Sequence, residues 1–259
     1  MLIGQVFTEA QVILFALVWL RMVSFVLSAA FFSSPSVNVP VKILLSVVLT
    51  AIVAPMAQFH TQELGELSNS IIMMSLKEVA VGLILGFLTR FFFFALSMAG
   101  ELISVSLGLA SAQVYNPFSG NNGQVLEQFF SLFGMIVFLA LNGHHVFVTA
   151  LVESFQTLPV AKLSIEFGGL AELAKQFQQI FVIMIKMAAP VVITLFIVNM
   201  SMAIIGRAVP QINVLVTSFP VTIMIGLVVL IISMPLMSME MSLLLQSTST
   251  ELFKLMRAL

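Results

Sequence analysis

Long apolar runs separated by short polar breaks dominate the chain. The breaks contain residues that end or interrupt helices, such as Pro35, Pro55 and Pro159. Each run is close to the roughly 20 residues that a helix needs to cross a bilayer. The pattern therefore predicts an all-α integral membrane protein with six spans at face value, at residues 10–32, 41–56, 71–99, 129–141, 180–208 and 212–239.

Two polar connections stand out in this pattern, at residues 60–69 and 160–179. The second carries Lys162, Glu166, Glu172 and Lys175 and predicts a short solvated helix. This helix, at residues 161–179, divides the chain into a first region of residues 1–160 and a second of residues 180–259.

An uncharged polar stretch at residues 111–124 lies between two strongly apolar runs and holds the only tyrosine, Tyr115. Irregular backbone beside such runs is tolerated only where protein or a water-filled cavity satisfies its amide groups. One interpretation is a gate inside an assembly or pore. The alternative is an exposed loop that joins two spans.

Several charged side chains lie within or beside the apolar runs. Because a charge that faces lipid is costly, each should face a neighbouring helix, a partner subunit or water. Arg90 and Glu101 share a helix face but lie about 16 Å apart along it, so they cannot pair with each other. The set comprises Arg21, Lys77, Glu78, Arg90, Glu101, Lys186 and Arg207.

Small residues recur at helical spacing in two places. Gly82 and Gly86 form a G-x-x-x-G pair, and a second ribbon follows at residues 100–112. Such ribbons let helix backbones approach closely within membranes. They predict helix packing within the chain or contact between subunits, and the second ribbon comprises Gly100, Ser104, Gly108 and Ala112.

Composition supports the membrane interpretation. Of the 259 residues, 60% are hydrophobic and only 8% are charged, far from the balance of a soluble domain. The net charge of −1 and the lack of a basic run imply neither a nucleic acid nor an anionic lipid surface as a partner. An apolar run at residues 10–20 resembles a secretory signal, but the first basic residue, Arg21, follows it, so we expect the first helix to be retained.

Patterns typical of catalysis are lacking in the sequence. The chain has no cysteine and no aspartate, and no phosphate-binding glycine loop or serine elbow is found. His144 and His145 are adjacent and have no acid nearby in sequence to complete a zinc motif. A proton relay through these histidines with Glu101 and Glu127 is the remaining chemical alternative. The sequence predicts no enzyme and no cofactor.

The order of the motifs along the chain resembles the FliR family of flagellar export-gate proteins, which is related to the SctT proteins of virulence type III secretion. Each motif alone is weak, but their common order covers nearly the whole chain. The matching residues are Arg21, Pro35 and residues 39–42, 77–82, 86–87, 99–101, 108, 116–117, 142–145, 153–155, 158–159, 207–213 and 219–220.

This chain departs from the family pattern at two positions. Asn116 and Asn142 stand where the family often has aspartate. A mechanism that needs a carboxylate in the central loop is therefore in doubt. A hydrogen-bonding role remains, because asparagine both donates and accepts.

The resemblance implies a non-enzymatic, all-α subunit of a multi-subunit helical export gate, built of bent helical hairpins. Residues 1–160 would form a FliP-like region and residues 180–259 a FliQ-like hairpin with a C-terminal tail. Hydropathy would then report burial in protein as well as in lipid, so the count of six apolar runs would not be a count of membrane spans, and the charges would make intersubunit contacts.

The resemblance also implies specific site residues. A loop at about residues 108–123 would plug the closed pore, and a turn of the family motif would follow the penultimate apolar run at Pro210, Gln211 and Asn213. The plug would comprise Gly108, Gln113, Tyr115, Asn116, Pro117, Phe118, Gly120, Asn121, Asn122 and Gly123.

The implied partners are FliP-like and FliQ-like subunits, an FlhB-like protein, flagellar export substrates and membrane lipid. The implied place is the bacterial inner membrane at the centre of the flagellar basal body. A virulence secretion subunit is the first alternative. A secondary transporter is the second, and it would predict an inverted repeat, which the sequence does not show.

Overall fold

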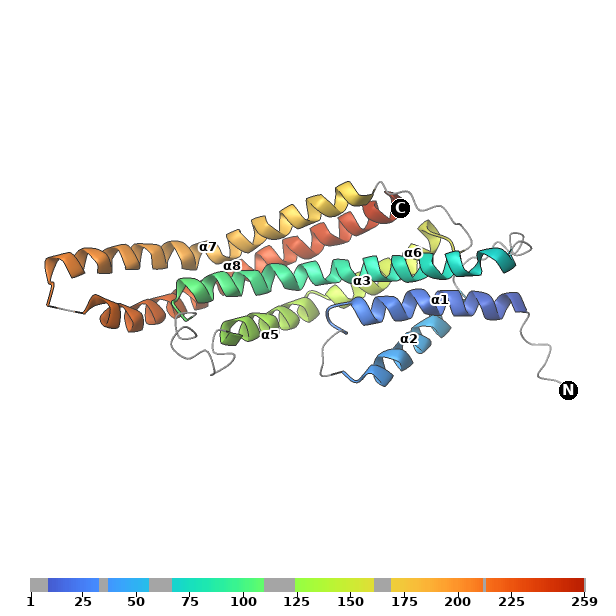
Figure 1. Ribbon diagram of the computed structural model, residues 1–259, viewed down its shortest axis with the longest axis horizontal. Helices are drawn as coiled ribbons and strands as arrows, with labels where there is room; N and C mark the ends of the chain where they lie inside the picture. Colours follow the sequence, from blue (N-terminus) through green and yellow to red (C-terminus); the bar gives the residue numbers. More distant parts are fainter. Residues whose placement is uncertain are drawn as a thin grey trace. The chain divides into compact units, whose positions relative to one another are not determined.

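The structure, a computed structural model, describes residues 9–32, 37–55, 67–109, 124–160, 169–211 and 213–258. All regular elements in these ranges are helices, which confirms the predicted all-α class (Figure 1). In chain order they are α1 (Glu9–Ser28), α2 (Val39–Val53), α3 (Leu67–Ser106), α5 (Gln124–Ala140), α6 (Gly143–Thr157), α7 (Gly169–Ala208) and α8 (Val214–Ala258).

The face-value count of six spans is wrong. Within the described ranges, four helices are long and apolar enough to cross a membrane: α1, α3, α7 and α8. The run at 41–56 forms only the 15-residue α2. The run at 129–141 belongs to α5, which bends by 66° into α6 at Asn142, so this bent pair makes at most a fifth span.

The three longest helices exceed the thickness of a bilayer. Helices α3 and α7 have 40 residues each and α8 has 45. At 1.5 Å per residue each is about 60 Å long or more, about twice the hydrocarbon core. Each must therefore extend beyond the core or tilt steeply within it.

The polar connection at 161–179 is not a separate helix in its described part. Helix α7 begins at Gly169 and continues without a break past Gln179 to Ala208. The polar residues from Gly169 onward are thus the first turns of a long apolar helix, and residues 161–168 lie outside the described ranges.

The chain forms two compact units, and α3, α7 and α8 each contribute residues to both of them. The first comprises Met1–Phe91, Asn142–Gln176 and Ser247–Leu259, and the second comprises Phe92–Leu141 and Phe177–Gln246. The resemblance of residues 1–160 and 180–259 to two other subunits concerns a different division and stays a prediction.

In the first unit, α1 lies between α2 and the first half of α3. Trp19 Nε1 donates a hydrogen bond to Ser46 Oγ of α2 at 3.0 Å. On the other side, the buried Thr89 Oγ1 of α3 accepts a hydrogen bond from Ala30 N at 2.9 Å, just after α1 ends. Side chains such as Val18, Phe25 and Leu85 fill this core and are almost fully buried.

In the second unit, glycines let α5 and α8 approach their neighbours. A Cβ atom added at Gly134 of α5 would overlap the Leu96 side chain of α3, and one at Gly226 of α8 would overlap Leu107. Lys186 and Glu240 join α7 and α8 with an Nζ to Oε2 distance of 3.7 Å. This unit is therefore held by close packing with a single weakly buried ion pair among its described residues.

Candidate functional site: a buried charge cluster and close helix contacts

Arg21 of α1 is fully buried and donates all five of its N–H groups. Its Nε donates to Glu78 Oε2 at 2.5 Å, and Nη2 donates to Glu78 Oε1 at 3.0 Å. Nη2 also donates to Leu158 O at 2.9 Å. Nη1 donates to Ser154 O at 3.0 Å and to Ser154 Oγ at 3.1 Å. One guanidinium thus joins α1, α3 and the C-terminal end of α6.

Lys77 and Phe155 complete this cluster. Lys77 Nζ donates to Pro159 O at 2.6 Å and lies 3.7 Å from Glu78 Oε1. The Phe155 ring lies 4.1 Å from Arg21 Cζ, in the geometry of a cation–π contact. Two cations therefore meet backbone carbonyls at and just beyond the end of α6, where the helix dipole favours positive charge.

The cluster is satisfied within one chain. Arg21, Lys77 and Glu78 are all buried, and Glu78 is the carboxylate that pairs with both cations. The expectation that partner subunits supply the counterparts of these charges is therefore wrong for these three residues. A bidentate arginine–carboxylate pair fixes geometry as well as charge, so the cluster sets the register of the three helices.

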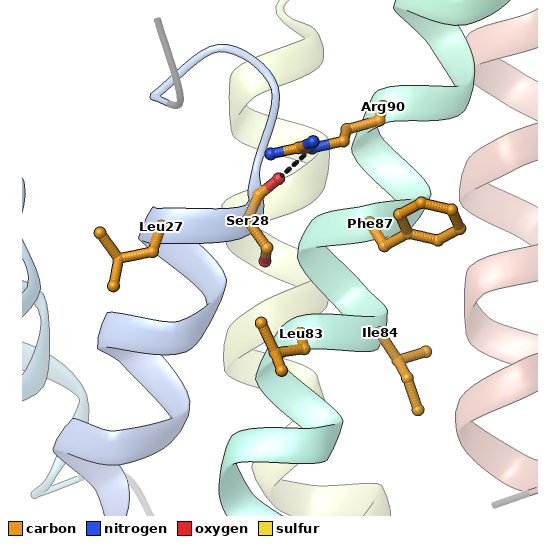
Figure 2. A pocket seen from close by; sticks show the side chains of 6 residues that line it. All are labelled: Leu27, Ser28, Leu83, Ile84, Phe87 and Arg90. Atoms are coloured by element: carbon orange, nitrogen blue, oxygen red, sulfur yellow. Dashed lines mark hydrogen bonds between the residues drawn. The ribbon is translucent and has the colours of Figure 1, made fainter. Parts of the chain in front are cut away.

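The remaining charges from the sequence analysis lie elsewhere. Arg90 is half-buried, and its Nε donates to Ser28 O at the end of α1 at 2.7 Å. Glu101 is exposed on α3, and Arg207 is exposed in the last turn of α7. Lys186, the fourth remaining charge, forms the ion pair with Glu240 described above. Among these four described residues, Arg90 is the one whose side chain bonds to α1, the helix that carries Arg21 (Figure 2).

Gly82 and Gly86 lie directly against α1. A Cβ at Gly82 would overlap the Arg21 carbonyl oxygen and the Ser24 side chain. A Cβ at Gly86 would lie 2.8 Å from the Phe25 carbonyl oxygen. The first small-residue pair is therefore a packing contact within the chain, and it brings α3 close enough for Glu78 to reach Arg21.

Replacing Gly86 with leucine is expected to separate α1 from α3 and to lower stability by about 1–3 kcal/mol or more, because backbone atoms cannot give way as a flexible side chain does. Thermal unfolding of the detergent-extracted protein measures the effect. Ala51→Leu, at an exposed position of α2, is the matched control. Equal unfolding temperatures for the two variants would show that the close contact contributes nothing.

The residues of the second ribbon of small residues have different roles in the structure. A Cβ at Gly100 would lie 2.6 Å from Phe130 Cδ2 of α5, so this glycine also serves packing within the chain. Ser104 is buried, and Ala112 lies outside the described residues. Gly108 has a φ of 80° and ends α3.

Gly108 and Leu109 close α3 with the hydrogen-bond pattern of a Schellman motif. Gly108 N donates to Val105 O at 3.0 Å, and Leu109 N donates to Ser104 O at 3.2 Å. A left-handed residue at this position favours glycine. Gly108 therefore ends α3 and marks the start of the predicted plug loop.

Most of the predicted plug falls outside the described residues, which resume at Gln124, the first residue of α5. This applies to Gln113, Tyr115, Asn116, Pro117, Phe118, Gly120, Asn121, Asn122 and Gly123, whose role stays a prediction.

The predicted turn of the family motif lies between α7 and α8. Pro210 and Gln211 are exposed in a turn that follows α7. The Asn213 carbonyl accepts hydrogen bonds from Val216 N and Thr217 N, both at 3.1 Å, and so starts α8.

The histidines and glutamates of the proton-relay alternative make few polar contacts. His144 and His145 pack edge to face with ring centroids 4.3 Å apart. His144 Nδ1 is buried and has no hydrogen-bond partner among the described residues. Glu127 accepts a hydrogen bond from Ser97 Oγ at 3.1 Å. In the described part of the chain, no three or more side chains of metal-ligand type come together.

Sequence reasoning predicted no specific contact for Ser154, Phe155, Leu158 or Phe130, although it interpreted Phe130 as packing bulk. The first three belong to motifs that carry the resemblance, which is the one signal that pointed to them. Their contact with Arg21 depends on how α6 packs, and Phe130 is one of many phenylalanines in an apolar run. Neither contact follows from local sequence.

Comparison with known proteins agrees with the resemblance. The sequence model of the family described as "Bacterial export proteins, family 1" matches residues 12–248. The flagellar biosynthetic protein FliR of Pectobacterium carotovorum subsp. carotovorum is 29% identical over 84% of this chain and 83% of its own length. The FliR protein of Aquifex aeolicus is 29% identical over 92% of both chains. That of Bacillus subtilis is 32% identical over 65% of this chain and 66% of its own.

Proposed function

The chain belongs to the bacterial export proteins of family 1, and from this membership we propose that it is a subunit of the flagellar type III protein export gate. In this role it is non-enzymatic and forms part of the pore through which unfolded flagellar proteins are secreted. The observation that carries the proposal is the family match at residues 12–248, joined to relatives whose names place them in flagellar biosynthesis.

The exposed faces of the long helices support a subunit that works in a larger assembly. Helices α7 and α8 expose large apolar side chains along much of their length, including Phe196, Ile204, Ile231 and Ile232. Such faces are covered by lipid or by neighbouring subunits in a membrane. FliP-like and FliQ-like subunits are the proposed neighbours, with an FlhB-like protein at the entrance, in the bacterial inner membrane at the centre of the basal body.

The loop that follows α3 is the proposed plug of the closed pore. Its first residues are fixed by the helix end at Gly108, and its last join α5 at Gln124. The uncharged polar sequence between them suits a lumen that alternates between a sealed state and passage of an unfolded chain.

Copurification is the direct test of the proposed assembly. A tagged chain extracted in mild detergent is expected to bring FliP-like and FliQ-like subunits with it, identified by mass spectrometry. A Gly86→Leu variant should bring less of both, because the helix contact next to the charge cluster is disturbed, whereas Ala51→Leu should behave as the parent chain. Recovery of the parent chain alone, as a stable monodisperse species, would contradict the proposal.

A further inference from the structure

Two prolines interrupt the helices of the α7/α8 hairpin at nearly the same level. Pro190 lies inside α7 and Pro235 lies inside α8. The ion pair of Lys186 with Glu240 joins the two helices close by. Pro190 follows Lys186 by about one turn, and Pro235 precedes Glu240 by just over one turn. Because the helices are antiparallel, both interruptions lie about one turn beyond the ion pair, on the side toward the turn between α7 and α8.

Each proline weakens its helix at this level. Proline has no N–H group and its ring crowds the preceding turn, so the carbonyl one turn earlier in each helix loses its usual hydrogen bond. Thr194 Oγ1 donates to Pro190 O and Ser238 Oγ donates to Pro235 O, both at 2.7 Å. Hydroxyls that bond to the preceding turn in this way often bend helices. Figure 1 shows that α7 changes direction midway along its length.

The side chains packed near the prolines are adaptable. Met187 of α7 and both Met237 and Met241 of α8 are almost fully buried. Methionine has a flexible, unbranched side chain that fills irregular gaps, so a core that contains it repacks more readily than one of branched side chains. Weakened helices and an adaptable core at one level are the properties expected of a hinge.

Beyond the prolines, the tip of the hairpin, residues 191–234, packs on the last residues of the α3 segment. A Cβ atom added at Gly226 of the tip would overlap Leu107 Cδ2, and one added at Gly108 would lie 3.2 Å from Phe219 Cε2 of the tip. Leu107 directly follows α3 and is only 1% exposed. These two contacts, which we call the latch, lie within the second unit and cover the point where α3 ends.

We propose that the two prolines form a hinge, on which the tip swings away from the end of α3 and releases the latch. The ion pair on the other side of the prolines keeps the rest of the hairpin joined. The structure shows the closed latch. The consequence for export rests on the proposed function, because the proposed plug begins where the latch lies. A closed latch then accompanies the sealed pore, and an open latch accompanies secretion.

Spin labels on one helix measure the hinge in the assembled gate. The chain has no cysteine of its own, so Gln178→Cys and Ile204→Cys, at exposed positions of α7 on either side of Pro190, carry its only labels. A straight helix would separate these positions by about 39 Å. A hinge predicts a broad distribution of distances that extends from shorter values toward this length.

The control for this measurement is a chain with Pro190→Ala and Pro235→Ala. Alanine restores the missing N–H groups and favours a regular helix, so we expect a narrow distribution close to the length of the straight helix. A single narrow distance in the parent gate would mean a rigid bend and would overturn the proposal. So would an equally broad distribution in the alanine variant.

A reversible lock tests whether the latch has to open during secretion. A cysteine Sγ at position 107 would take the place of Leu107 Cγ, which lies 3.4 Å from a Cβ atom at position 226, close enough for a disulfide. In a chain with Leu107→Cys and Gly226→Cys, oxidation is expected to stop secretion and reductant to restore it. Each single variant should secrete equally with and without oxidant.

The outcomes separate this inference from the proposed function. If copurification recovers no partner subunits, the proposed function fails, and the spin-label distances in the extracted chain still decide whether the hinge exists. If the partners are recovered and the oxidised lock secretes normally, the hinge proposal is overturned while the proposed function stands. The same holds if reductant does not restore secretion, because the substitutions themselves would then be the cause.

Discussion

Arg21→Met is expected to leave little folded chain in the membrane. The substitution removes the guanidinium that donates hydrogen bonds to Glu78, Ser154 and Leu158. Glu78 keeps its longer ion pair with Lys77, at 3.7 Å. Breaking a buried ion pair by removing one partner costs about 3–5 kcal/mol. Since whole proteins are stable by about 5–15 kcal/mol, this loss is enough to depopulate the folded state.

The amount of chain in the membrane fraction, and the unfolding temperature of what remains after extraction, measure the loss. Arg207→Met is the matched control because Arg207 is exposed at the end of α7. Arg21→Lys should be intermediate, since an ammonium has three donors and cannot reproduce the fork of five. A methionine variant that accumulates and unfolds like the control would show that the cluster does not hold the helices.

A second substitution separates lost charge pairing from lost packing. Combining Arg21→Met with Glu78→Met removes both members of the pair, and well-packed apolar replacements of a buried pair are often neutral. We expect partial recovery, because Lys77 and the carbonyls of Ser154 and Leu158 still lose partners. An additive loss in the double variant would mean that Arg21 and Glu78 contribute independently.

The sequence was sufficient to predict the class of the fold but not the number of spans. Apolar runs identify helices because hydropathy is a local property. The bend of 66° between α5 and α6 occurs at one residue, Asn142, which has a φ of 56°. Asparagine adopts this conformation more readily than most residues, but nothing local says which asparagine does so. The six-span count failed at this bend and at α2, which is too short to span.

For the charge cluster, the sequence predicts that the buried charges have partners but not which residues those partners are. A charge inside an apolar run must be satisfied, and that much follows from the sequence. The partner of Arg21 is 57 residues away, and its identity depends on α1 and α3 running side by side in the same direction. Gly82 marks that approach and lies one turn from Glu78, so the small-residue spacing and the buried charges were signals of a single contact.

Deleting residues 115–120 is expected to make the inner membrane leaky to ions and small solutes while secretion of flagellar proteins persists or falls only in part. This expectation rests on the proposal that the loop after α3 plugs the pore. The helix end at Gly108 is fixed by two hydrogen bonds, so any movement of the loop starts after Leu109. Tyr115 and Phe118 are the bulky side chains available to fill the lumen when the pore is closed.

A variant of unchanged length distinguishes the effect of side chains that fill the lumen from the effect of shortening the loop. Tyr115→Ser combined with Phe118→Ser should also raise the leak, measured as uptake of a small dye or as membrane conductance, because it removes bulk without shortening the chain. Leu132→Ser, at an exposed position of α5, is the control for a loss of apolar bulk elsewhere. An engineered disulfide from the loop to a neighbouring subunit should do the reverse and stop secretion until reductant is added. If the membrane is equally tight with and without residues 115–120, the loop is an ordinary connection between α3 and α5, and the seal must be formed by another part of the assembly.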